Sequence, residues 1–81
     1  MVLHILIADD EQKSRQGLRN IIDWSALGYE IVGEAADGEQ AVSFLLERKP
    51  DVVLLDISMP RLNGLEVIER ARQQGYEGKV I

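Results

Sequence analysis

Two short apolar runs that each end in aspartate constrain this chain more than any other feature. Residues 4–8 are followed by Asp9 and Asp10, and residues 52–55 are followed by Asp56. If both runs are neighbouring strands of a parallel sheet, their carboxyl ends share the edge at which open α/β sheets bind ligands. Three carboxylates that converge there repel one another, and a hard cation with oxygen ligands, such as Mg²⁺, offsets that repulsion. The pattern therefore predicts a magnesium-binding acidic pocket.

The spacing of apolar residues predicts strands and helices in alternation. Residues 3–8 are apolar apart from one histidine, which is typical of a strand covered on both faces, as in a parallel sheet. The order βαβαβαβ gives a parallel sheet with flanking helices and right-handed crossovers. The other strands are expected at residues 29–35, 51–56 and 79–81, and the helices at residues 9–22, 37–49 and 65–74.

The ends and inner faces of these helices follow from particular residues. Asp9 or Asp10 is expected to cap the first helix, Asp37 with Gln40 the second, and Gly75 to end the third. The inner face of the first helix is expected to carry Leu18, Ile21 and Ile22.

Three glycines bear on these assignments. Gly17 lies inside the first helix at a cost of about 1 kcal/mol relative to alanine, for which close packing on the sheet is one explanation. Gly33 weakens the assignment of the second strand. Gly64 is expected in a turn with positive φ.

Composition excludes several classes of function. The chain of 81 residues carries a formal net charge of -5, which disfavours nucleic-acid contact by this segment. It has no cysteine, so disulfides and thiolate metal sites are excluded, and His4 alone cannot build a zinc site. No apolar run is long enough to span a membrane, and the start lacks the pattern of a signal peptide. We therefore expect a cytoplasmic protein with no membrane contact.

Three segments carry a family resemblance. Residues 7–11 (IADDE), 36–41 (ADGEQA) and 51–60 (DVVLLDISMP), with Asn63 and Gly64 after them, resemble the receiver domain of bacterial two-component response regulators. The resemblance runs from the first strand to the last residue and implies a flavodoxin-like fold and a signalling module rather than an enzyme. Residues 23–30 are similar to receivers that precede AraC-type DNA-binding domains.

The resemblance implies a role for each residue of the acidic pocket. Asp56 matches the phosphoacceptor, whose carboxylate attacks a phosphohistidine of a sensor histidine kinase. Asp10, Asp56 and the backbone carbonyl of Ser58 would ligate Mg²⁺ directly, and Asp9 would reach the ion through water. The ion would offset the repulsion between the anionic nucleophile and the phosphoryl group. Ser58 also matches a position that bears on the lifetime of the phosphate.

The family pattern extends beyond this chain. Receivers continue after strand four with further units that carry a hydroxyl residue, a lysine and an aromatic switch residue. We therefore expect residues 1–81 to form a single truncated receiver domain, the βαβαβαβ portion only, with impaired phosphorylation. The open flank of strand four predicts a homodimer across the truncated edge. DNA would be contacted only through a missing output domain.

Other interpretations remain open. The chain is alternatively a structural half-domain that homodimerises and has no signalling activity, or Asp9 and Asp10 merely cap a helix while Asp56 caps a loop. A metal-dependent phosphatase would usually place its two aspartates one residue apart, whereas here they are adjacent. A flavin or dinucleotide module is disfavoured, because the acidic turn at residues 8–11 repels phosphate and lacks a glycine-rich cradle.

Overall fold

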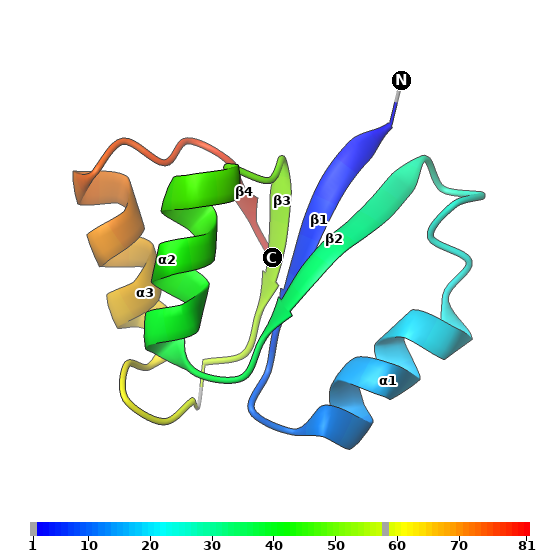
Figure 1. The fold of residues 1–81 in the computed structure, drawn as a ribbon, viewed down its shortest axis with the longest axis horizontal. Helices are drawn as coiled ribbons and strands as arrows, with labels where there is room; N and C mark the ends of the chain where they lie inside the picture. The colour runs from blue at the N-terminus through cyan, green and yellow to red at the C-terminus, as the bar shows by residue number, and fades with distance from the viewer. Residues whose placement is uncertain (1, 58) are drawn as a thin grey trace.

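Within the part of the chain that the structure describes, four parallel strands form one sheet and three helices connect them (Figure 1). The computed structural model describes residues 2–57 and 59–81. The strand order is β2-β1-β3-β4, so β1 lies between β2 and β3 as the acidic pocket requires. The expected βαβαβαβ order is confirmed. The elements are β1 (Leu3–Ala8), α1 (Gln12–Ile21), β2 (Tyr29–Ala35), α2 (Gly38–Arg48), β3 (Val52–Leu55), α3 (Gly64–Gln73) and β4 (Lys79–Val80).

The register between strands brings their carboxyl ends to one level. Ala8 of β1 is paired with Leu55 of β3 and with Ala35 of β2. The ladder continues past the strands, because the Asp56 N–H donates to the Ala8 carbonyl at 2.9 Å and the Asp9 N–H donates to the Ala35 carbonyl at 3.0 Å. The chain therefore leaves β1 and β3 side by side, with an aspartate next in each.

The main core lies on one face of the sheet, beneath α2 and α3, which stand together in Figure 1. Side chains alternate between the faces of a strand, so Leu6 and Val53 point into this core while Ile5 and Ile7 point to the other face. The buried members of this core are Leu6, Ala8, Ala35, Ala41, Leu45, Val53, Met59, Leu62, Val67, Ala71 and Tyr76.

α1 covers the opposite face less completely. Within the described chain no residue of α1 is fully buried, although Leu18 is half-buried. The expectation that Ile21 faces inward is wrong, since its side chain is 85% exposed. The backbone becomes extended at Ile22, so the helix ends at Ile21 and the following residue is the half-buried one.

The helix ends show which capping predictions hold. Asp37 caps α2, since its Oδ1 accepts the Gln40 N–H at 2.8 Å. Asn63 forms a full capping box with Glu66 at α3. The expectation that Asp9 or Asp10 caps α1 is wrong, because α1 begins one residue after Glu11 and has no side-chain cap. The two aspartates lie in the loop before the helix, where their carboxylates are available to a ligand.

The glycines are explained by contacts that the sequence does not show. Gly33 lies under the Phe44 ring, where a Cβ would meet Cε2 at 2.3 Å. Gly17 has no such reason, since a Cβ there would meet nothing within 4 Å, and close packing is therefore not its explanation. Gly64 does not adopt positive φ, because among the described glycines only Gly28 and Gly75 do so.

No helix within residues 2–57 and 59–81 is long and apolar enough to cross a membrane.

Candidate functional site

Three aspartates meet at the carboxyl edge of the sheet. One carboxylate oxygen from each of Asp9, Asp10 and Asp56 lies within 4.8 Å of the other two. Asp9 and Asp56 are half-buried and Asp10 is exposed, so the cluster is open to solvent on one side. The convergence expected from the sequence is confirmed, and its cause is the level register of β1 and β3.

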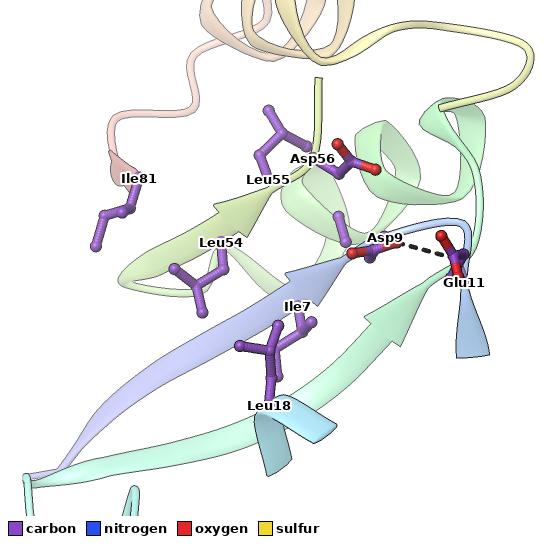
Figure 2. Close-up of a pocket in the computed structure, with 9 residues that line it drawn as sticks. Ile7, Asp9, Glu11, Leu18, Leu54, Leu55, Asp56 and Ile81 are labelled. Atoms are coloured by element: carbon purple, nitrogen blue, oxygen red, sulfur yellow. Dashed lines mark hydrogen bonds between the residues drawn. The ribbon is translucent and has the colours of Figure 1, made fainter. Parts of the chain in front are cut away.

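The loop that carries Asp9 and Asp10 is held on several sides. The Asp9 carboxylate accepts the Glu11 N–H at 2.9 Å, which closes a tight turn before α1 (Figure 2). The Asp9 carbonyl accepts a hydrogen bond from the guanidinium of Arg15. The Asp9 N–H donates to the Ala35 carbonyl of β2. Every backbone polar group of Asp9 is therefore engaged, and its position is tied to β2 and α1.

The loop after Asp56 is held by the start of α3. The Gly64 N–H donates to the Ile57 carbonyl at 2.8 Å. A Cβ on Gly64 would meet the Asp56 carbonyl oxygen at 2.8 Å and the Ile57 Cα at 2.9 Å. Gly64 therefore allows two backbone segments to approach each other closely, and it is not required for a turn with positive φ. Ser58, the expected source of a carbonyl ligand, lies outside the described residues.

A hollow extends from the acidic cluster along the face of β1 and β3 (Figure 2). Its acidic end is formed by Asp9, Asp56 and Glu11, and its other end is apolar. Within the described chain, no lysine or arginine lines this hollow. The apolar part is lined by Ile7, Ala8, Leu18, Leu54, Leu55 and Ile81.

The residues of the cluster fit a magnesium ion. Mg²⁺ takes oxygen ligands at about 2.1 Å in octahedral geometry, so its ligand oxygens lie about 3 to 4 Å apart. The three carboxylate oxygens lie within 4.8 Å of one another, which is close enough for one ion to be shared by the three side chains, directly or through a bound water. The side chains offer oxygen alone, which is the donor type that Mg²⁺ prefers.

An ion-pair network beside the site was missed by the sequence analysis. Glu34 of β2 accepts hydrogen bonds from Arg15 and Arg19, one on each carboxylate oxygen. Burial raises the pKa of Glu34, but the hydrogen bonds from Arg19 and Arg15 outweigh burial and hold the pKa below its usual value. The only sequence signal was the spacing of the two arginines by four residues, which places them on one face of a helix.

Comparisons with known proteins agree with the structure. The family model described as the response regulator receiver domain matches residues 5–81. The nitrate/nitrite response regulator protein NarL of Escherichia coli (strain K12) is 36% identical over 77 residues, covering 95% of this chain and 35% of NarL. The chain thus spans about a third of the length of this curated relative.

Solved structures are similar over the whole sheet. The REC domain of AraT, a response regulator from Geobacillus stearothermophilus, has a TM-score of 0.86 at 41% identity, over 99% of this chain and 64% of that one. A chain of the CheX–CheY–BeF3–Mg²⁺ complex from Borrelia burgdorferi has a TM-score of 0.78 at 28% identity, over 96% of this chain and 58% of that one. These matches confirm the expected flavodoxin-like fold. With the parallel sheet and the acidic cluster, they show that the chain belongs to the response regulator receiver domain family.

Proposed function

We propose that this chain is a phosphoacceptor in a two-component phosphorelay and that Asp56 receives the phosphoryl group. The observation that carries the proposal is the meeting of Asp9, Asp10 and Asp56 at the end of β1 and β3. A carboxylate oxygen of Asp56 would form a bond to phosphorus while the bond from phosphorus to the imidazole nitrogen of a kinase phosphohistidine breaks. The electron pair of the broken bond stays on that nitrogen, and the product is an aspartyl phosphate.

The roles of the other acidic residues follow from the charge of the reaction. Asp10 and Asp56 would hold Mg²⁺ directly with the Ser58 carbonyl, and Asp9 would hold it through water. The bound ion would supply neutralisation of the anionic phosphoryl oxygens. The similar Borrelia burgdorferi complex contains Mg²⁺ together with BeF3, and this supports the same ion here.

We also propose that the 81-residue chain is phosphorylated slowly. No basic side chain lines the hollow within the described residues, so no fixed cation complements the phosphoryl oxygens that Mg²⁺ does not reach. Phosphoryl transfer depends on such charge stabilisation more than on covalent chemistry.

Acyl-phosphate treatment followed by intact mass spectrometry tests the proposal. With acetyl phosphate and Mg²⁺ in excess, the wild-type chain should gain one phosphoryl group, and Asp56→Asn should gain none. Asp51→Asn is the matched control, because Asp51 lies at the opposite end of β3 and is exposed. Phosphorylation of Asp51→Asn but not of Asp56→Asn supports the assignment. No gain of mass in the wild type would instead favour a structural module without signalling activity.

The proposed partners are a sensor histidine kinase and a second copy of this chain. β4 has two residues and is paired only with β3 among the described strands, so its outer edge is open to another strand. Beside it, Ile81 is 64% exposed and Leu54 is half-buried in the hollow. Association of two copies at this edge would cover both features.

Light scattering after size-exclusion chromatography tests the homodimer. The wild type should elute as a dimer at high micromolar concentration, and Ile81→Lys should shift it toward monomer by placing a charge at the apolar contact. A monomeric wild type at that concentration contradicts the proposal.

We propose that this segment itself does not contact nucleic acid and that DNA is reached through an output domain elsewhere in the protein. Its net charge of -5 would repel the phosphate backbone. Fluorescence anisotropy with labelled duplex DNA at physiological salt should show no binding, and saturable binding would refute this.

A further inference from the structure

We propose that Arg15, held by Glu34, is a positioning residue that fixes the Asp9–Asp10 loop for metal binding. This inference rests on the proposed function. It concerns the affinity of the acidic cluster for Mg²⁺, not whether Asp56 is phosphorylated. Arg15 is well suited to the role, since one guanidinium contacts both the loop and the sheet. Its Nε donates to Glu34 Oε1 at 2.7 Å, and its Nη1 donates to the Asp9 carbonyl.

The two hydrogen bonds of Arg15 link the carbonyl of Asp9 to β2. Glu34 is paired with Ile7 in the register of β1 and β2, and the next residue, Ala35, accepts the Asp9 N–H. β2 therefore holds Asp9 twice, once directly at its N–H and once through Arg15 at its carbonyl. The N–H and the carbonyl of Asp9 belong to the two peptide units on either side of its Cα. Because both units are held, the backbone at Asp9 has little freedom to rotate, and the adjacent carboxylates are directed accordingly.

These hydrogen bonds are needed because α1 packs only weakly on the rest of the protein. This helix has no side-chain cap, and within the described chain none of its residues is fully buried. Apolar packing therefore does little to fix the start of α1 and the loop before it. The Arg15 side chain is 13% exposed and that of Glu34 is 28% exposed, so their ion pair is shielded from solvent more than a surface pair is.

Charge and positioning predict opposite effects of removing Arg15. A cation close to the acidic cluster disfavours a second cation, so its removal should tighten Mg²⁺ binding if charge alone matters. If Arg15 orients the loop, its removal should weaken Mg²⁺ binding. Residues that orient metal ligands typically change affinity by about 10-fold or more when substituted. The sign of the change therefore separates the two effects.

The change in Mg²⁺ affinity is measured by titrating the full chain with Mg²⁺ and recording the backbone amide chemical shifts by NMR. Arg15→Gln should raise the dissociation constant about 10-fold. Arg15→Lys keeps the charge but not the planar fork and should also weaken binding, though less. Arg19→Gln is the matched control, because Arg19 contacts the same Glu34 but not the Asp9 carbonyl. The Mg²⁺ dissociation constant of Arg19→Gln should stay within about twofold of the wild-type value, as expected when an exposed ion pair is removed.

The outcomes separate this inference from the proposed function. If the wild type shows no Mg²⁺-dependent shifts, the proposed function fails. If the wild type binds Mg²⁺ and Arg15→Gln binds it equally or more tightly, the positioning role is refuted.

A second readout needs no metal. The Asp9 N–H donates to the Ala35 carbonyl and the Glu11 N–H donates to the Asp9 carboxylate, so hydrogen exchange at these two amides should be faster in Arg15→Gln than in Arg19→Gln. Equal rates in the two variants would overturn the inference even if one of them were less stable overall.

Discussion

The same substitution should have opposite effects at two glycines of this fold. At Gly64, a methyl group would meet the Asp56 carbonyl oxygen at 2.8 Å and the Ile57 Cα at 2.9 Å. Both atoms belong to the backbone, so no side chain can turn away to relieve the contact. At Gly17, the added methyl group would meet nothing within 4 Å. Gly64→Ala should therefore destabilise the protein, whereas Gly17→Ala should stabilise it.

The magnitudes follow from the local geometry. Overpacking of a tight contact costs about 1–3 kcal/mol, and this outweighs the helix propensity that alanine would add at the first residue of α3. An open helical site such as position 17 gains about 0.5–1 kcal/mol from alanine. The free energies of unfolding of the two variants should therefore differ by about 1.5–4 kcal/mol.

Urea unfolding monitored by Trp24 fluorescence measures this difference. Trp24 is half-buried and its Nε1–H donates to the Leu18 carbonyl, so its emission should report loss of structure. The midpoint of Gly64→Ala should fall and that of Gly17→Ala should rise. Because the clash in Gly64→Ala moves the backbone of Asp56, its Mg²⁺ affinity should fall as well. A Gly64→Ala protein as stable as the wild type would refute the close-approach explanation.

Three further predictions concern single contacts. Asn63→Ala removes the capping box of α3 and should lower the free energy of unfolding by about 1 kcal/mol, measured by urea unfolding. Tyr76→Phe removes the buried hydrogen bond to the Pro50 carbonyl, 2.7 Å long, and should cost about 1 kcal/mol in the same assay. The pKa of Glu34 is lowered in the folded state, so its ion pairs stabilise the protein above the unfolded value near 4.5 and this contribution is lost as the pH falls through the folded value. The stability difference between the wild type and Glu34→Gln should therefore shrink from pH 7 to pH 3, and a constant difference would contradict the direction of the shift.

The local sequence was enough to determine the strands, the helices and the edge at which the acidic residues lie. The apolar run before Asp9 and the run before Asp56 each match a strand, and the alternation with helices requires parallel pairing. Side chains at the ends of adjacent parallel strands share an edge, so the sequence predicted the meeting of Asp9, Asp10 and Asp56 on the condition that β1 and β3 are neighbours. The strand order β2-β1-β3-β4 meets that condition. The Asp37 cap was equally local, because its partner Gln40 lies three residues away.

Contacts between distant segments were decided only by the tertiary structure. Gly64 looked like a turn residue, but the backbone after β3 passes too close to it for any Cβ. Ile21 looked like a core residue, but α1 ends there and leaves it exposed. Arg15 and Glu34 are 19 residues apart and meet only because the fold brings α1 and β2 within reach of two long side chains. Periodicity reports which face of an element is apolar, whereas the distance between two backbones and the partner of a charge depend on how the elements pack together.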